Sequence, residues 1–432
     1  MELVGPYLFL PFVVLLIAGV PIAFALGVSS MVFLLFSGTT IPPIMAVNQM
    51  FPAVGKFALL ALPMFVLTGE LLNRCNITDK LVEFARLLVG WMKGGLGHVN
   101  IVTSMFFAGI SGSVLADVAS IGPILIPAMV RERYPRAFSA ALTAASSVIG
   151  AIIPPSVPMI IVGSQLGISV GGLFAAGVIP GILVGAVLML VNFAICLRWD
   201  YGEMHRYEGV VAVGAGAFRA IPALMIPVVL LGGILSGFFT PTEAGAVAVL
   251  YTILVGSLYY RTLTWKKFAD ALLASAKVTA SALMIVATAI VFSQFLTFYQ
   301  IPQEILQGML AVTESRVVLI LLIIVFFLIV GTFMDAIANM IILGPLLMPI
   351  MVDGLGMHPI QFGMFLMVGL LLGLLTPPLG LCLFIAAPIA KASLESTSLA
   401  VIPFLIAELF VLLLIAFIPA ITLTVPRLAG FI

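Results

Sequence analysis

Charged residues are scarce in this sequence: Asp, Glu, Lys and Arg make up only 8% of its 432 residues. Soluble globular domains carry about 25% charged residues, so a water-facing surface cannot be built from so few. Hydrophobic residues make up 63% of the chain. The 40 Gly and 27 Pro fit membrane helices, in which both are commoner than in soluble ones. The composition therefore predicts a polytopic membrane protein.

Other absences exclude further classes of protein. The three cysteines, Cys75, Cys196 and Cys382, have unrelated spacings, which excludes a disulfide framework and a cysteine-based metal cluster. The net charge of +1 gives no sign of a nucleic-acid partner. An ATP-driven pump is disfavoured because no GxxxxGK[ST] phosphate loop occurs. No basic leader precedes the apolar stretch 7–36, so we expect a retained span there and no cleaved signal peptide.

Runs with few charges set the expected crossings, since a helix of about 20 residues crosses the hydrocarbon core. Residues 137–197 and 220–260 each allow two crossings, the first pair with a turn near Gln165–Ser169. Runs 99–130 and 317–352 hold one carboxylate each and are too long for one upright helix and too short for two. Each is predicted to be a re-entrant hairpin whose tip lines a protein-buried or watery cavity.

The basic residues test this division of the chain, because 15 of the 18 Lys and Arg fall in five places. These are 74–93, 131–136, 198–219, 261–277 and the single Lys391. If both hairpins count as no crossing, all five places lie on one side, which the positive-inside rule makes cytoplasmic. The two hairpins then enter the membrane from opposite faces.

An internal repeat agrees with this symmetry. GPILIPAMV (122–130) matches GPLLMPIMV (344–352) at six of nine positions, at an offset of 222 residues. GAIIPPS (150–156) lies over GLLTPPL (373–379) at an offset of 223. Each half therefore carries a polar-tipped hairpin followed by a span with a double proline, which interrupts a helix. One such pair reads as a packing kink, but two symmetric pairs favour an ion and solute site between broken helices.

The chain resembles the large membrane subunit of the tripartite ATP-independent periplasmic (TRAP) transporters over essentially its whole length. The motifs that carry the resemblance are ISGSVLADVASIGPILIPAM, IIPPSVPMIIVG, FFTPTEAGAVAVLY, GTFMDAIANMIILGPLLMPI and LLTPPLGLCLFIAAP. The resemblance implies a bacterial inner-membrane secondary transporter that imports organic acids, such as dicarboxylates or sialic acid, on a sodium gradient. It also implies a separate small four-helix membrane subunit and a periplasmic solute-binding protein. No organic cofactor is expected.

Carried over onto matching positions, the resemblance implies two Na+ sites built from oxygen ligands. The first would comprise Ser111, Gly112, Ser113, Asp117, Gly150, Pro154 and Pro155. The second would comprise Gly331, Thr332, Asp335, Thr376 and Pro377. Candidate substrate contacts are Ser156, Asn339 and Pro378. Asp117 and Asp335 have an alternative role in helix capping or in hydrogen bonding at the hairpin tips. No Lys or Arg lies mid-membrane, so helix N-termini, hydroxyls and sodium are expected to meet the substrate carboxylate.

The predicted fold class is an all-α integral membrane protein: an inverted-repeat, elevator-type transporter with two re-entrant hairpins and two Pro-Pro-broken transmembrane helices. Two segments, 99–165 and 301–390, form the halves of the transport domain. The rest comprises N-terminal scaffold spans and a cytoplasmic amphipathic arm (1–98), connecting and scaffold spans with a cytoplasmic loop at 198–219 (166–300), and a C-terminal span (391–432).

Three local features receive structural explanations. Thr240-Pro241-Thr242-Glu243 predicts a helix start with a capping box. Residues 74–93 predict an amphipathic helix on the cytoplasmic surface. Glu408 is expected near the end of a span, where its side chain can extend to the interface.

Rival functions remain open at this point. Gly109-Ile110-Ser111-Gly112 matches the GxSG of rhomboid-type intramembrane serine proteases, but the three His residues lie at segment mouths or in a charged loop and offer no membrane-embedded base. A channel is another class of alternative, and it would conduct without a binding protein. A binding-protein-independent sodium/dicarboxylate symporter is the closest alternative, and only the family resemblance disfavours it.

Overall fold

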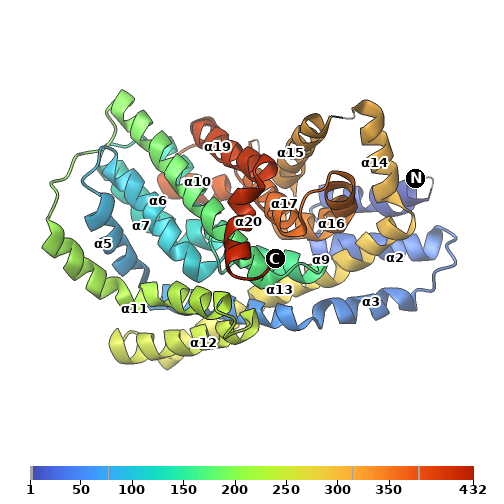
Figure 1. Cartoon of the computed structure of the whole chain (residues 1–432), viewed down its shortest axis with the longest axis horizontal. Helices are drawn as coiled ribbons and strands as arrows, with labels where there is room; N and C mark the ends of the chain where they lie inside the picture. Colours follow the sequence, from blue (N-terminus) through green and yellow to red (C-terminus); the bar gives the residue numbers. More distant parts are fainter. Residues whose placement is uncertain (1–2, 76, 314, 378–379) are drawn as a thin grey trace.

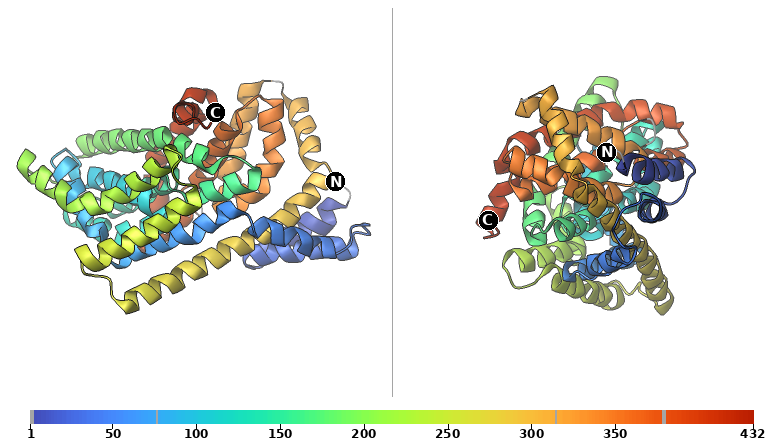
Figure 2. Two further views of the ribbon diagram at one scale, coloured as in Figure 1. Left: turned by 60° about the horizontal axis from the view of Figure 1, so that its bottom comes forward. Right: turned by 90° about the vertical axis from the view of Figure 1, so that its right-hand side faces the viewer.

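The computed structural model describes residues 3–75, 77–313, 315–377 and 380–432, with the backbone alone at 302, 306 and 309–312. These residues form helices and connecting turns, and no β-strand occurs among them. The molecule is elongated (Figure 1), and one long helix, α13, runs beneath much of its length (Figure 2).

The helices up to residue 199 are short near the N-terminus and longer afterwards. They are η1 (Gly5–Phe9), α1 (Leu10–Ile17), α2 (Ile22–Phe36), α3 (Ile44–Val54), η2 (Phe57–Leu60), α4 (Ala61–Arg74), α5 (Ile77–Val89), α6 (Gly95–Ser111), α7 (Val114–Arg131), α8 (Arg136–Ile152), α9 (Val157–Leu166) and α10 (Val170–Trp199).

The remaining helices follow a loop of ten residues. They are α11 (Val210–Leu235), α12 (Pro241–Leu254), η3 (Val255–Tyr259), α13 (Trp265–Phe298), α14 (Ile301–Val312), α15 (Arg316–Phe333), α16 (Ala336–Met348), η4 (Pro349–Gly354), α17 (Pro359–Gly373), α18 (Leu381–Ala390), α19 (Leu394–Phe417) and α20 (Pro419–Leu428).

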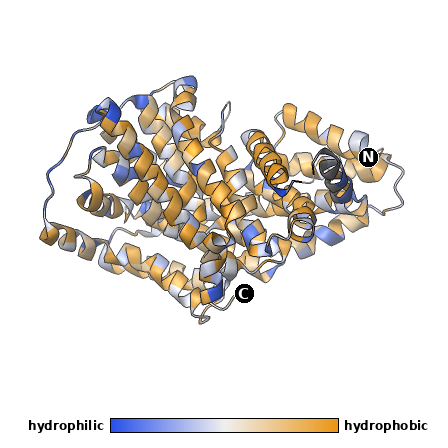
Figure 3. Ribbon diagram, turned by 45° about the horizontal axis from the view of Figure 1, so that its top comes forward, coloured by the Kyte–Doolittle hydropathy of each residue, from blue (hydrophilic) through white to orange (hydrophobic). Residues whose placement is uncertain are grey.

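Nine helices of the described chain are long and apolar enough to cross a membrane, or up to ten if the bent pair α8 and α9 counts as one span. Apolar positions run along most of each helix (Figure 3). The prediction of a multi-pass, all-helical membrane protein is therefore confirmed. Length and composition do not separate a re-entrant arm from a crossing helix, so the re-entrant hairpins and the elevator motion stay predictions.

The internal repeat is visible as four helices that recur in the same order. At offsets of 222–223 residues, α6, α7, α8 and α9 fall on α15, α16, α17 and α18. The two halves interlock, because α9 packs against α16 and α17 while α18 packs against α7 and α8. The last helix of each half is thus held by the other half.

Four of the five basic segments meet on one side of the molecule. Five side-chain contacts join them: Lys93–Asp200 (2.5 Å), Arg133–Glu203 (3.6 Å), His205–Glu132 (2.9 Å), Arg219–Glu83 (3.3 Å) and Arg74–Asp270 (3.9 Å). The structure thus places segments 74–93, 131–136, 198–219 and 261–277 together, as the positive-inside argument requires.

Local sequence signals explain several helix boundaries. Thr240 accepts a hydrogen bond from the Glu243 N–H (3.3 Å), and the Glu243 carboxylate accepts one from the Thr240 N–H (2.8 Å), which is the predicted capping box. The predicted turn near Gln165–Ser169 is also present, since α9 ends at Leu166 and Ser169 caps α10. The amphipathic segment forms α5, which packs against α6 and α11.

The prediction for Glu408 is wrong. This residue lies in the middle of α19, its exposed fraction is 1%, and neither carboxyl oxygen has a hydrogen-bond partner among the described residues. The apolar sequence around Glu408 does not mark where the helix ends, and α19 extends without interruption to Phe417. The side chain therefore cannot reach an interface.

Acidification should destabilise the start of α17 through His358. Its Nδ1 accepts the Ile360 N–H (3.2 Å), which a ring protonated at that nitrogen cannot do. Burial, and then the charge of Arg427, lowers the pKa of His358 from its ordinary 6.5. Because the folded pKa of His358 is depressed, the unfolded chain binds the proton first, and the free energy of unfolding falls as pH drops below about 6.5.

Thermal unfolding at about pH 7.5 and about pH 5.5 should show this loss of stability in the native chain and a smaller loss in His358→Asn, which keeps a capping side chain. An equal loss in both proteins would contradict the assignment.

Candidate functional site

The first hairpin turns sharply at Gly112. α6 ends at Ser111, Gly112 adopts a left-handed conformation (φ +60°), and Ser113 caps α7 by accepting the Ala116 N–H at 3.5 Å. Only glycine adopts this backbone conformation without a penalty. The two arms, α6 and α7, pack against each other. The first hairpin therefore has two packed arms joined by a turn with polar residues, and its re-entrant path stays a prediction.

The first break lies at Pro154-Pro155, as the double proline predicts. α8 ends at Ile152, α9 begins at Val157, and the two helix axes differ by 45°. The peptide bond between the prolines is cis. Ser156 caps α9 by accepting the Met159 N–H (3.4 Å), and its hydroxyl donates to the Ala151 carbonyl (2.6 Å). The predicted substrate contact Ser156 thus has a capping role in this structure.

The hairpin tip and the break contact each other through backbone atoms. The Val157 N–H donates to the Gly112 carbonyl at 3.1 Å. A Cβ atom at Gly112 would lie 2.7 Å from the Pro155 carbonyl oxygen, and one at Gly150 would lie 3.3 Å from the Ser113 carbonyl oxygen. The structure therefore brings together most of the residues predicted for the first sodium site, with carbonyl oxygens among them.

Two oxygen atoms of this region lack a protein partner. The Ser111 hydroxyl is buried and has no hydrogen-bond partner among the described residues. The same holds for the Oδ1 atom of Asp117, whose side chain has an exposed fraction of 0%. Buried polar atoms are almost always satisfied in folded proteins, so each of these oxygens has a free coordination position that fits a cation such as Na+.

The other carboxyl oxygen of Asp117 belongs to a buried chain of hydrogen bonds. Ser104 donates to Asp117 Oδ2 at 2.8 Å and contacts Ser146 at 3.2 Å. Ser146 donates to Asn100 Oδ1 (3.1 Å), and the Asn100 amide donates to Thr143 (2.6 Å). This network links α6, α7 and α8 beneath the hairpin tip. Sequence reasoning missed it, although Asn100 and Ser104 are one helical turn apart in an apolar run and could have been found by that spacing.

The second hairpin has an acidic cap where the first has a serine. Asp335 begins α16 and accepts the N–H groups of Ile337 (2.9 Å) and Ala338 (3.3 Å). The capping alternative for Asp335 is thus observed, and it leaves the second carboxyl oxygen available. Asn339, a predicted substrate contact, donates to the Val330 carbonyl (3.4 Å) and the Met334 carbonyl (3.5 Å) and so closes the turn of its own hairpin.

Near the second break, Gly331 of α15 and Gly373 of α17 let the backbones of these two helices come into contact. A Cβ at Gly331 would lie 2.8 Å from Gly373 Cα, and a Cβ at Gly373 would lie 2.4 Å from Gly331 Cα. The hydroxyls of Thr332 and Thr376 donate to carbonyls of their preceding turns at 2.7 Å and 2.9 Å. Pro377 lies in the connection between α17 and α18. Pro378, a predicted substrate contact, lies outside the described residues.

A cavity of about 70 Å³ lies where the two halves meet. Ser113, Val114 and Leu115 line it together with their repeat counterparts Asp335, Ala336 and Ile337, and Val157, Pro158, Leu371 and Leu374 complete the lining. The N-termini of α7, α9 and α16 thus converge on one cavity from both halves. N-terminal ends of helices carry partial positive charge, and the N–H groups of Val114, Leu115 and Ala336 have no partner among the described residues. The start of α9 adds its dipole but no free N–H group, because its N–H groups bond to Gly112 and Ser156 and Pro158 has none. The arrangement favours an anion.

The cavity is small in this conformation. Its volume is well below the roughly 300–1,000 Å³ of typical small-molecule pockets. A small organic anion needs more room, so binding requires the residues that line the cavity to move apart. Sequence reasoning did not place Val157 and Pro158 in the site, because only the tertiary packing brings the start of α9 to the second hairpin.

Comparisons with known proteins show which family this chain matches. The model of the tripartite ATP-independent periplasmic transporter DctM component matches residues 9–421. The chain is 37% identical to the sialic acid TRAP transporter large permease protein SiaM of Vibrio cholerae, over 96% of each chain. It is also 37% identical to the C4-dicarboxylate TRAP transporter large permease protein DctM of Pseudomonas aeruginosa, over 94% of each chain. In fold it is similar to the YdaH transporter of Alcanivorax borkumensis, with a TM-score of 0.62, 16% identity and 99% of each chain covered.

Proposed function

Because the chain belongs to the DctM component family of the tripartite ATP-independent periplasmic transporters, we propose that it imports an organic anion on a sodium gradient. The chain is a large permease subunit and not an enzyme, so the protease alternative for Ser111 is excluded. In the proposal the transporter lies in the bacterial inner membrane. It acts with a small four-helix membrane subunit and receives its substrate from a periplasmic binding protein.

The observation that carries the proposal is the convergence of three helix N-termini on the cavity between the two halves. A carboxylate bound there would accept hydrogen bonds from the free N–H groups at the starts of α7 and α16 and meet the positive ends of three helix dipoles. Lys and Arg are absent from the described residues that line the cavity. Bound sodium beside the hairpin tips would supply the remaining positive charge.

The proposed substrate class is a small carboxylate. Two relatives at the same identity of 37% have different named substrates, sialic acid and C4-dicarboxylates. A carboxylate group is what these two substrates share. Overall similarity therefore does not choose between them, and the proposal extends to organic acids that the helix N-termini can bind through that group.

The proposed sodium sites use the backbone as much as the side chains. The Ser111 hydroxyl and Asp117 Oδ1 have free coordination positions, and the carbonyls of Ser113 and Pro155 lie at the close contacts of the first site. In the second half the carbonyls of Leu370 and Gly331 lie at the close Gly331–Gly373 contact, and one oxygen of Asp335 remains free of its two capping hydrogen bonds. Oxygen ligands of this kind suit a hard cation.

Alternating access is proposed to occur by an elevator motion, in which the hairpins and broken helices move together. Two polar contacts join α9 to the N-terminal segment. Lys56 donates to the Ser164 carbonyl (2.7 Å), and the Gln165 amide donates to the Ala53 carbonyl (3.4 Å). If residues 99–165 move as a block against the N-terminal scaffold, these contacts must break during transport.

Removing either hairpin carboxylate should weaken sodium coupling. We expect Asp117→Ala and Asp335→Ala each to raise the sodium concentration for half-maximal uptake by about tenfold or more, on the order expected for losing one charged ligand. The measurement is uptake of a labelled organic acid into vesicles that contain the reconstituted transporter. Asp353→Ala is the matched control, because Asp353 is an exposed acid at the mouth of the second hairpin.

The same assay separates the proposal from its closest alternative. Uptake should require the binding protein outside the vesicles and the small subunit in the membrane. Uptake by this chain alone would favour a binding-protein-independent symporter. Unchanged sodium dependence in both aspartate variants would remove these residues from the coupling sites.

A further inference from the structure

A positively charged hollow lies on the side of the molecule where the basic segments meet. Two adjoining cavities, of about 270 Å³ and about 430 Å³, are both lined by Arg86, Leu87 and Glu208. They lie between α5, the connection 200–209 and the first turns of α11. We refer to the two cavities together as the Arg86 hollow.

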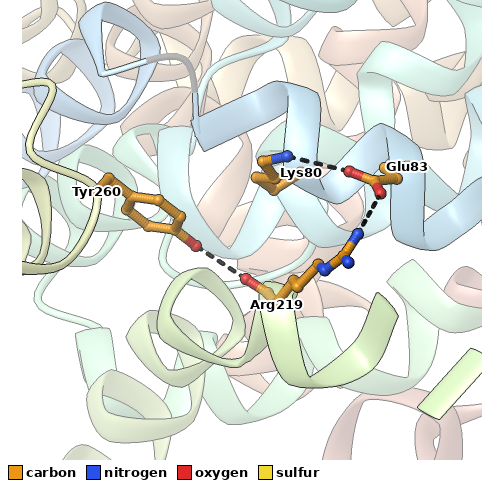
Figure 4. Close-up of polar contacts among 4 residues, drawn as sticks. All are labelled: Lys80, Glu83, Arg219 and Tyr260. Atoms are coloured by element: carbon orange, nitrogen blue, oxygen red, sulfur yellow. Dashed lines mark hydrogen bonds and ion pairs between the residues drawn. The ribbon is translucent and has the colours of Figure 1, made fainter. Parts of the chain in front are cut away.

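One acidic side chain of the Arg86 hollow is already neutralised. Glu83 contacts Lys80 (3.1 Å) and Arg219 (3.3 Å) at once, as Figure 4 shows. The hydrogen bond from Lys80, and to a lesser degree the charge of Arg219, lowers the pKa of Glu83, so this carboxylate stays ionised at neutral pH. The Tyr260 hydroxyl donates to the Arg219 carbonyl (3.1 Å) and so helps to hold the Arg219 backbone in place.

The remaining charges leave an excess of cations. Arg86 and Arg206 line the hollow, and no acidic side chain of the described chain lies within ion-pair distance of either. His205 is occupied with Glu132 at 2.9 Å. Glu208 is the one acid of the lining without an ion pair among the described residues. Two unpaired guanidiniums facing a cavity favour a ligand with phosphate oxygens, which arginine binds in a bidentate manner.

An exposed apolar strip continues from the hollow along α11. The exposed fractions are 77% for Val210, 87% for Val211 and 69% for Phe218. At the other edge Trp91 and Tyr207 are in edge-to-face contact, with ring centroids 5.9 Å apart. Trp and Tyr concentrate where a membrane meets water, since one part of each ring is apolar and another is polar. A ligand that fits this surface has an anionic head and an apolar tail.

We propose that the Arg86 hollow binds the phosphate headgroup of an anionic phospholipid, whose acyl chains lie along Val211 and Phe218 of α11. Basic pockets between helices on the cytoplasmic side of membrane proteins suit such headgroups. α5 and α11 approach each other closely here, since a Cβ at Gly216 would lie 2.4 Å from Leu87 Cδ1. A bound lipid would brace α5 against α11 and fix the position of both relative to the charged connection 200–209.

Lipid binding to the purified transporter, with the subunits that co-purify, tests this proposal. Phosphatidylglycerol added to the detergent-solubilised protein should raise its unfolding temperature, and phosphatidylcholine should not. Arg86→Gln/Arg206→Gln should weaken phosphatidylglycerol binding about thirtyfold, on the order expected for two cations near a headgroup. The matched control Arg131→Gln/Lys266→Gln removes two exposed cations from the same side and should bind as the native protein does. The two single variants replace the double variant if it fails to fold.

Three results would overturn the proposal. Equal stabilisation by inorganic phosphate alone would identify a free-phosphate site. An equal loss in the control variant would reduce the effect to general charge attraction. Loss of a co-purified protein subunit from Arg86→Gln/Arg206→Gln, with lipid binding unchanged, would identify the hollow as a protein interface.

Discussion

Gly112→Ala should reduce sodium-driven uptake at least about tenfold while the protein still inserts and folds. Two costs combine at this position. A left-handed backbone costs a residue with a Cβ about 1–2 kcal/mol. The new methyl group would also lie 2.7 Å from the Pro155 carbonyl oxygen, so the hairpin tip must move away from the first break. That movement breaks the hydrogen bond from the Val157 N–H to the Gly112 carbonyl, which orients the start of α9.

Gly167→Ala is the matched control for this experiment. Gly167 is also left-handed (φ +70°), but a Cβ there would meet no atom within 4 Å. Gly167→Ala therefore carries the cost of the left-handed backbone but adds no contact with the break between α8 and α9. Gly112→Ala should lose more thermal stability than Gly167→Ala, because it carries both costs, and only Gly112→Ala should lose uptake. If the two variants lose uptake equally, the tip–break contact has no specific role in transport.

Gly331→Ala and Gly373→Ala should impair the second half in the corresponding way. The added methyl would lie 2.8 Å or 2.4 Å from a Cα atom of the opposite segment, and backbone atoms cannot move aside as a flexible side chain can. Overpacking of this kind costs about 1–3 kcal/mol. If that cost falls on the ion-bound geometry, the sodium concentration for half-maximal uptake should rise about tenfold to a hundredfold.

Gly232→Ala controls for the change of residue type. Gly232 lies within α11, and a Cβ there would meet no atom within 4 Å. Alanine favours a helix by about 1 kcal/mol over glycine, so this variant should be as stable as the native protein or slightly more stable. Normal sodium dependence in Gly331→Ala and Gly373→Ala, with the proteins folded, would show that the second glycine contact does not shape an ion site.

The sequence allowed prediction of the features that single residues determine. Pro154-Pro155 predicts the break between α8 and α9 because proline cannot continue a helix, and the structure has the break there. Thr240 and Glu243 predict a capping box because their spacing alone permits the two reciprocal hydrogen bonds. The repeat could be predicted for a similar reason, since the proline and glycine positions that shape each half recur in order.

Features that depend on packing between distant segments could not be predicted in the same way. Glu408 lies in an apolar run that does not show which face of α19 is covered, and the structure buries it completely inside the protein. The hydrogen bonds from Ser104 to Asp117 require α6 and α7 to fold back on each other. The approach of α9 to the second hairpin follows from the interlocking of the two halves, which no local pattern encodes.

The shared cavity is tested most directly by substrate protection of two cysteines. Leu115 and Ile337 are repeat counterparts that line it from opposite halves. In a background without the native cysteines, Leu115→Cys and Ile337→Cys are labelled with a maleimide, with and without the transported organic acid and sodium. We expect the organic acid and sodium together to slow the labelling of each cysteine, while a control cysteine at the exposed Val210 reacts at an unchanged rate. Protection of neither cysteine, or of only one, would contradict a binding site shared by the two halves.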